Sequence, residues 1–206
     1  MGNSNSHEVA FPLEPLNPMP VVMNDFCYEA PMSLVIPLST ARTKHNCTIQ
    51  TVDDVVVFLW RGDKSMLMNA ERSILMTMER RLHENINTHS VFVDCGERGP
   101  SGWLADITVN FLFPSDFEPY LLCSIDLPNH RNVSFTVEGD WADRTAIIYM
   151  HVDTRKIAAA RIRRWGQISR FGEYVVDVIP GVDVAFIVLL CIAIEVMANV
   201  TRGLIL

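Results

Sequence analysis

VDVAFIVLLCIAIEVMANV, residues Val182–Val200, is apolar on nearly every side of a helix, yet it carries acids towards both ends. A helix needs about 20 predominantly apolar residues to cross a bilayer. The uncharged run between Asp183 and Glu195 is Val184–Ile194, which would rise only about 16 Å as a helix. A helix that is apolar on all faces but too short to span a membrane is expected to be buried inside protein.

The flanking residues mark where this helix begins and ends. Pro180 and Gly181 interrupt the preceding strand pattern. Asp183 suits the positive N-terminal end of a helix, and Arg202 and Gly203 suit its C-terminal end. We therefore predict a helix over about residues 182–200. Its two acids should lie at the two ends of whatever encloses it, where water or arginines reach them.

The chain before the helix consists of short segments rich in β-branched residues, separated by turn residues such as Asp-Asp, Gly-Asp and Pro-Asn. This pattern predicts twelve strands: Leu34–Leu38, Cys47–Val52, Val55–Trp60, Ser65–Asn69, Ser73–Glu79, Ser90–Asp94, Leu104–Phe113, Tyr120–Asp126, Asn132–Glu138, Thr145–His151, Lys156–Arg163 and Glu173–Val178. Strands at this spacing are typical of a barrel or a sandwich. Because the last element is one all-apolar helix, we predict a mainly β fold, a closed antiparallel barrel that encloses its own C-terminal helix.

The first 31 residues differ in composition from the rest of the chain. Prolines at positions 12, 15, 18, 20 and 31 disfavour regular structure, and no Lys or Arg precedes Arg42. Apolar residues within this segment lead us to expect that part of it docks on the body: Phe11, Leu13, Leu16, Met19, Val21, Val22 and Met23. We predict a flexible, proline-rich tail over residues 1–31 and a barrel domain over residues 32–206.

Composition excludes several classes of protein. With 49% apolar residues the chain has material for a sizeable core, which excludes disorder throughout. A formal net charge of −7 argues against a nucleic-acid binder. The five cysteines are widely spaced and form no C-x-x-C, which indicates reduced thiols in a cytosolic compartment. No secretory signal is visible at the N-terminus.

Three segments of the C-terminal half carry a specific pattern: FTVEGDWADRTAIIY (Phe135–Tyr149), KIAAARIRR (Lys156–Arg164) and YVVDVIPGVDVAFIVLLCIAIEVM (Tyr174–Met197). In their motifs and spacing they resemble the LURP-one-related family, also called the DUF567 family. The resemblance extends over about residues 33–206. It implies a fold similar to the tubby C-terminal domain and to phospholipid scramblases, a closed barrel around a central C-terminal helix. That agrees with the fold predicted above from strand spacing and helix length.

The resemblance implies less about function than about fold. Members of the family are linked to pathogen defence in plants, and no enzymatic activity is established for them. Tubby domains bind phosphoinositides through a basic surface, and scramblases are associated with lipids. Both similarities direct attention to membranes, although function belongs to sites rather than to folds.

A lipid attachment site is predicted at the start of the chain. MGNSNS, residues 1–6, matches the M-G-x-x-x-[ST] pattern for N-myristoylation at Gly2. A single myristoyl chain binds membranes only marginally, with an association constant of order 10⁴ M⁻¹, so stable attachment requires a second signal.

A run of basic residues without an intervening acid is the candidate for that second signal: Arg155, Lys156, Arg161, Arg163, Arg164 and Arg170. Each basic residue near an anionic leaflet contributes about 1 kcal/mol, so a few that face one way would match the lipid chain. An alternative stays open, in which these residues belong to a solvated pair of strands with partners such as Glu173, Asp153 or Asp177.

Motifs for catalysis and metal binding are weak. HENINTH (His83–His89) has its histidines six apart, whereas a zinc-protease helix needs them four apart, so a loop between strands is predicted. Carboxylates at Asp53–Asp54 and Asp140–Asp143 are candidate calcium ligands, but turn residues that bind their own backbone are the favoured interpretation. Trp141 is expected to pack against the barrel. We expect no enzymatic activity, no cofactor and no metal.

These observations favour a non-enzymatic, membrane-associated binding or scaffold protein that recognises anionic phospholipid or phosphoinositide headgroups. It would be a cytoplasmic monomer, peripheral at the inner face of the plasma membrane. Two alternatives stay open. One is a soluble protein-interaction module in signalling or defence, with contacts made by the tail and the Gly99–Glu118 loop. The other is scramblase-like lipid handling.

Overall fold

The structure is a computed structural model that describes residues 16–37, 45–83, 86–94, 102–110, 119–127, 131–165 and 172–203. It contains a short 3₁₀ helix η1 (Asn24–Phe26), twelve strands and one α-helix, α1 (Val184–Gly203). The strands are β1 (Met32–Pro37), β2 (Asn46–Thr51), β3 (Val56–Arg61), β4 (Met66–Asn69), β5 (Ile74–His83), β6 (Ile86–Val93), β7 (Gly102–Asn110), β8 (Tyr120–Leu127), β9 (Arg131–Asp140), β10 (Thr145–Val152), β11 (Arg155–Arg164) and β12 (Glu173–Val178).

The strands form one closed barrel, as predicted. Each strand pairs antiparallel with its neighbours in the sequence, and β12 pairs with β1 to close the ring. Alternation along the strands points one set of side chains inwards; in β8, for example, Leu121, Cys123 and Ile125 are buried, whereas Leu122 and Ser124 are exposed. All twelve predicted strands are present, with boundaries that differ by a few residues.

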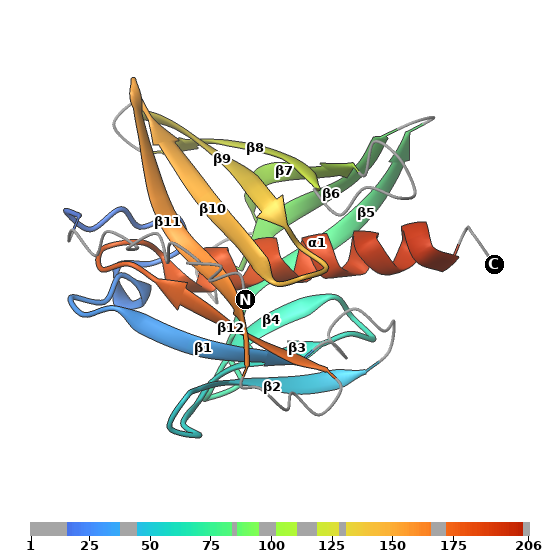
Figure 1. The fold of residues 1–206 in the computed structure, drawn as a ribbon, viewed down its shortest axis with the longest axis horizontal. Helices are drawn as coiled ribbons and strands as arrows, with labels where there is room; N and C mark the ends of the chain where they lie inside the picture. Colours follow the sequence, from blue (N-terminus) through green and yellow to red (C-terminus); the bar gives the residue numbers. More distant parts are fainter. Residues whose placement is uncertain are drawn as a thin grey trace, which may run out of the picture.

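Helix α1 lies inside the barrel, as predicted, with strands on both sides of it (Figure 1). Every residue from 184 to 195 is buried, which explains why the segment is apolar all round. Phe186 of the helix packs on Phe135 of β9 with ring centroids 5.2 Å apart. Within the described part of the chain, no helix has the length and apolar character required to cross a membrane.

One predicted loop is wrong. HENINTH was expected to connect two strands, but β5 extends to His83 and β6 begins at Ile86. The register continues regularly, so that Arg80 lies opposite His89 and Glu79 opposite Ser90. The physical reason is that the polar residues of this segment are accommodated in a strand: His89 is buried, and Ser90 is buried too and donates to Asp106 Oδ1 at 2.6 Å.

Part of the predicted tail contacts the barrel. Leu16 and Met19 donate backbone hydrogen bonds to Pro180 and Gly181, at distances of 3.2 and 2.9 Å. Phe26 in η1 is buried and packs on Phe58 of β3 with centroids 5.5 Å apart. The docking expected for part of residues 1–31 therefore involves the segment from Leu16 onward, which covers the N-terminal end of α1; residues 1–15, with Phe11 and Leu13, lie outside the described residues.

Candidate functional site

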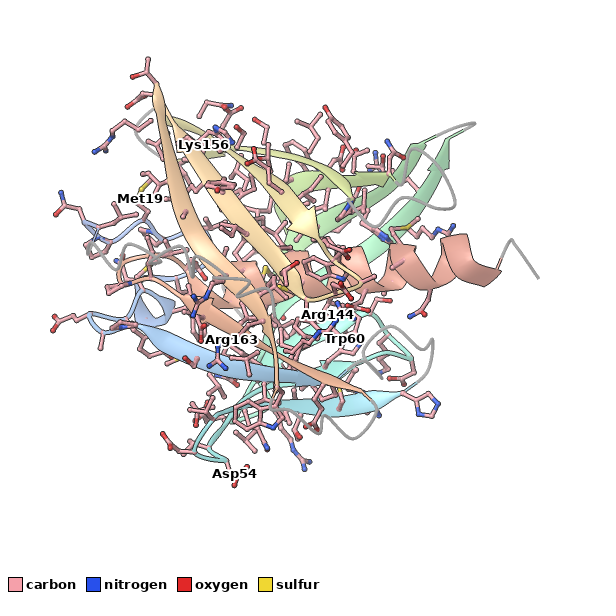
Figure 2. All side chains as sticks on the ribbon, in the orientation of Figure 1. Met19, Asp54, Trp60, Arg144, Lys156 and Arg163 are labelled. Atoms are coloured by element: carbon pink, nitrogen blue, oxygen red, sulfur yellow. The ribbon has the colours of Figure 1, made fainter. Side chains whose placement is uncertain are left out.

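A buried polar cluster holds α1 to the barrel wall near the helix's C-terminal half. Glu195 accepts hydrogen bonds from Trp141 Nε1, at 2.7 Å, and from the Arg144 guanidinium. The Arg144 guanidinium also stacks over the rings of Tyr174 and Trp141, 4.5 and 5.5 Å from their centroids. Because Arg144 and Glu195 are both buried, each needs the other to satisfy its charge. The expected packing of Trp141 and the expected arginine beside Glu195 are both present (Figure 2 labels Arg144).

The turn between β9 and β10 positions Arg144. Gly139 has φ +99°, and a Cβ there would lie 2.5 Å from the Thr145 carbonyl oxygen, so this position requires glycine. The Asp140 carboxylate then accepts the backbone N–H of Asp143 at 2.7 Å. Arg144 itself has φ +58°. The turn thus directs the Arg144 side chain into the interior of the barrel, where it reaches Glu195.

Asp183, at the other end of the helix, has different partners from those predicted. Its carboxylate accepts the backbone N–H groups of Val21 and Val22, at 3.0 and 2.7 Å, and that of Phe186 at 3.1 Å. Water or arginines were expected there, but the segment from Leu16 onward folds over this end and leaves Asp183 only 1% exposed. Burial raises the pKa of Asp183 even though these N–H groups oppose the shift.

The buried side chains of Cys123, Cys191 and Tyr174 are protonated at neutral pH. Burial, assisted by Asp106, raises the pKa of Cys123 to about 12, and burial raises the pKa of Cys191 further. Burial also raises the pKa of Tyr174 well above its usual range. Because thiolate is the reactive form of cysteine, Cys123 and Cys191 are poor nucleophiles.

The predicted basic run is spread along β11 rather than gathered at one place. Lys156 and Arg163 lie at well-separated points of the strand (Figure 2). Seven residues at the strand rise correspond to about 23 Å. Arg170 and Gly2 lie outside the described residues. The structure therefore brings together only part of the predicted set.

Most of the described basic residues have acidic partners. Arg163 Nε and Nη2 donate to the two carboxylate oxygens of Asp177 at 2.7 and 3.1 Å, and Arg161 Nη2 donates to it at 3.3 Å. The partners of the other residues are Glu138 for Lys156 and Asp143 for Arg164. Arg155 is exposed, and no ion pair is assigned to it in the described ranges. Asp177 is thus a cross-strand partner of the kind that the alternative interpretation named.

Asp177 is the electrostatic centre of this surface. Burial alone would raise the pKa of Asp177, but hydrogen bonds from Arg163, Ser33 and Arg161 outweigh burial and hold the pKa below its usual range. Asp177 is therefore ionised at neutral pH and offsets the nearby guanidinium charges. The face presents fewer net positive charges than the sequence suggests.

The carboxylates considered for calcium make turn contacts. Asp54 accepts from Gln50 Nε2 at 3.0 Å, and Asp140 accepts from the backbone of Asp143. This agrees with the favoured interpretation of turn residues that bind their own neighbourhood. Among the described residues, no group of three His, Cys, Asp or Glu side chains is placed to hold a metal ion.

A groove of about 700 Å³ lies beside η1, between it, the β2–β3 turn and the β4–β5 turn. We call it the η1 groove. Its apolar lining includes Met23, Val55 and Val56, whose exposed fractions are 42, 60 and 38%. Its acidic lining residues are Asp25, Glu71 and Asp94, and the described lining contains no Lys, Arg or His. Exposed apolar side chains beside acids are an arrangement that suits a partner rather than water.

Comparison with family models matches residues 35–195 to LURP-one-related. The chain belongs to the LURP-one-related family. Comparisons with curated proteins and with solved structures gave no match. In this LURP-one-related chain the matched region ends at Glu195, so it includes the Arg144–Glu195 pair but excludes Met23 and Asp25 of the η1 groove. The groove thus combines family and non-family residues.

Sequence reasoning missed the η1 groove. Its residues come from four separate stretches of this LURP-one-related chain, and no local pattern connects them. One signal was available in the sequence. The two valines at positions 55 and 56, which are exposed, directly follow the turn residues Asp53 and Asp54. An apolar residue in a turn, where polar residues are usual, can indicate a contact surface.

Proposed function

We propose that this protein is a non-enzymatic binding module that acts as a monomer and uses the η1 groove to recognise a partner protein. The segment recognised would carry apolar side chains flanked by Lys or Arg. It is a form of the protein-interaction alternative left open by the sequence, with the contacts at the η1 groove, which includes Met23 and Asp25 of the tail. Residues 99–101 and 111–118 of the Gly99–Glu118 loop named in that alternative lie outside the described residues. The observation that carries it is the exposure of Met23, Val55 and Val56 in a groove whose charged lining residues are all acidic.

The interior supports a binding role over catalysis. Glu195 is committed to Arg144 and Trp141, and Asp183 to three backbone N–H groups. Groups held in this way stabilise the barrel and are not poised for proton transfer to a substrate. Scramblase-like lipid handling would require α1 to leave the barrel and expose a face that is buried throughout residues 184–195.

Charge complementarity defines the partner. Asp25 and Glu71 offer carboxylates beside the valines, and no ion pair of either is assigned in the described part of the chain. A partner with Lys or Arg next to its apolar anchors gains steering as well as contact area. An acidic partner segment would be repelled.

Selection of peptides from a displayed random library on the immobilised full-length protein tests this proposal. We expect enriched peptides to share apolar residues with adjacent Lys or Arg. Val55→Asp and Glu71→Lys should each weaken binding of these peptides by about tenfold or more, because each removes a central anchor or reverses a rim charge.

Two matched variants serve as controls. Leu122→Asp changes an exposed apolar residue on β8, and Glu173→Lys reverses an exposed acid at the start of β12; neither lines the groove. Both should bind the selected peptides normally. Selected peptides without basic residues, or binding that the groove variants leave unchanged, would overturn the proposal, as would the failure of any groove-dependent peptide to emerge.

Membrane association is a second candidate, favoured by the partial exposure of Lys156 and Arg163 and the greater exposure of Arg164 despite their acidic partners. It would place the protein in the cytoplasm, peripheral at the inner face of the plasma membrane, with Gly2 acylated. Co-sedimentation with phosphoinositide-containing vesicles tests it. Binding should fall in Gly2→Ala and in Arg155→Glu with Arg164→Glu, and stay unchanged in Lys64→Glu. Unchanged binding in the first two would reject this candidate.

A further inference from the structure

Residues 16–28, which we call the strap, lie outside the closed ring of strands, at the end of the barrel where α1 begins (Figure 1). The ring is complete without them, because β12 pairs with β1. The strap meets the barrel through a few backbone hydrogen bonds, such as those from Met19 N–H to the Gly181 carbonyl and from Gly181 N–H to the Tyr28 carbonyl, both at 2.9 Å. Phe26 is its one buried residue, and the others are half-buried or exposed. A segment attached in this way is expected to open at a lower free energy than the barrel.

The Asp183 carboxylate holds the strap closed. One of its oxygens accepts the N–H groups of Val21 and Val22 in the strap, and the other accepts that of Phe186 in α1. The same side chain therefore joins the strap to the start of the helix. Burial under the strap raises the pKa of Asp183, so its ionised form is less favourable in the closed state than in water. Opening would rehydrate this charge, which partly offsets the hydrogen bonds that opening breaks.

The strap can move away from the barrel without disturbing β1. Residues 29–31 connect the two, and all three are exposed. At its other end the strap rests on Gly181, which has φ +82° and where a Cβ would overlap the Leu16 carbonyl. The strap thus lies on a surface shaped to receive it, and an exposed connection joins it to the barrel.

The strap also forms one wall of the η1 groove. Its residues Met23 and Asp25 line the groove, opposite Val55 and Glu71 from the two barrel turns. Asp183 binds the backbone of the two residues directly before Met23. Opening of the strap would therefore remove an apolar residue and an acid from the groove while the barrel wall stays in place.

We propose that the strap is a movable wall of the η1 groove, held closed by Asp183, and that strap closure and partner binding favour each other. This regulation rests on the proposed use of the groove by a partner protein. A partner segment that touches both the strap and the barrel turns binds the closed state, so it shifts the strap towards closure. By the same linkage, a change that opens the strap lowers the apparent affinity in proportion to the closed fraction that remains.

Hydrogen exchange of the full-length protein, followed by NMR at single amides, tests the strap. In Asp183→Ala the Met19 amide is followed, because its acceptor, the Gly181 carbonyl, is retained. In Met19→Asp the Val22 amide is followed, because its acceptor Asp183 is retained. Each of these amides should exchange about tenfold faster or more than in the native protein, since each substitution removes contacts of the closed strap. The amide of Ile148, in the middle of β10, should keep its native protection.

Asn17→Asp is the matched control, because it places the same charge as Met19→Asp at an exposed position of the strap and should exchange as the native protein does. If Asp183→Ala does not fold, Met19→Asp decides, since it leaves the helix and the barrel unchanged. Unchanged exchange of the Val22 amide in Met19→Asp overturns the proposal. So does a native strap whose amides exchange only as slowly as that of Ile148, because the strap would then open only with the whole barrel.

The peptides selected on the η1 groove test the coupling. A saturating peptide should slow exchange of the native Met19 amide, and Met19→Asp should weaken peptide binding by about tenfold or more although Met19 does not line the groove. Asn17→Asp should bind normally, and Val55→Asp should weaken binding without faster exchange at Met19. Groove-dependent peptides that bind Met19→Asp as they bind the native protein would overturn the coupling and leave the proposed function standing. If no groove-dependent peptide emerges, the proposed function and the coupling both fail, whatever exchange shows of the strap.

Discussion

Arg144 and Glu195 form a buried ion pair whose side chains are only 10 and 2% exposed. Each charge was taken out of water on folding, and each is compensated by the other and by Trp141. Removal of one partner leaves an unpaired buried charge, which costs far more than the pair contributes. At the scale of single residues, this pair fixes the position of α1 in the barrel.

Glu195→Gln is expected to reduce the free energy of unfolding by about 3–5 kcal/mol, because it leaves the Arg144 charge buried and uncompensated. Denaturant unfolding measures this change. Arg61→Ala is the matched control: it breaks an exposed pair with Asp63 and should cost at most about 1 kcal/mol. Equal effects of the two substitutions would contradict the assigned role of the buried pair.

His89 is a second buried residue with a measurable consequence. It is 2% exposed, and neither ring nitrogen has a partner among the described residues. Burial, with a smaller effect of nearby Arg80, lowers the pKa of His89 from 6.5 to about 4. The unfolded chain therefore binds a proton at higher pH than the folded chain does. Stability from this group is complete above about pH 6.5 and is lost as the pH falls towards 4.

His89→Leu should flatten the pH dependence of stability in this window. The native protein is expected to lose up to about 3 kcal/mol from this group between pH 6.5 and 4, and the variant should lack this loss. Unfolding in denaturant at a series of pH values measures it. His45→Gln, at an exposed position, should retain the native dependence. A parallel pH profile for His89→Leu would show that His89 is not the group responsible.

Helix α1 is the element on which the barrel depends. Its buried face provides the contacts that the inward side chains of all strands need, and the strands without it would surround an empty core. The segment from Leu16 to Tyr28 closes the N-terminal end of this core through Asp183 and Gly181. Helix, wall and covering segment therefore form a single packed unit.

Truncation after Gly181 should prevent soluble expression, because the chain would lose its interior. A milder change grades the same effect: Phe186→Ala should cost about 3–5 kcal/mol in the full-length protein. Calorimetry or denaturant unfolding measures the point variant, and expression with fractionation tests the truncation. Cooperative unfolding of the truncated protein would contradict the role assigned to the buried helix.

For the whole molecule, local patterns predicted the architecture well. The apolar segment Val184–Ile194 has one simple solution, burial inside the barrel, and strand periodicity with turn residues identified the strands. Contacts between segments that are distant in the sequence could not be predicted from local patterns. The partners of Asp183 lie at Val21 and Val22, and nothing in the local sequence of either segment names the other. The loop predicted over His83–His89 was wrong because β5 continues to His83 and β6 begins at Ile86, and polar residues such as His89 are buried in the strand.

The surface sites depend on the complete fold for the same reason. The charges near Arg163 were visible in the sequence, but their partial compensation by Asp177, which Arg161 and Arg163 share, depends on the pairing of β11 with β12. The η1 groove is built from η1 and two turns that are distant in the sequence, so its shape exists only after the barrel closes. The proposed binding of a partner protein takes place at the η1 groove.

Site-specific photo-crosslinking from position 55 in cells that express the protein tests that claim most directly. With a photoreactive residue in place of Val55, mass spectrometry should identify crosslinked protein segments that combine apolar residues with Lys or Arg. The added change Glu71→Lys should abolish these crosslinks, and the same photoreactive residue at position 122 should not produce them. Crosslinks from position 122 but none from position 55, or segments at position 55 that lack basic residues, would contradict the account.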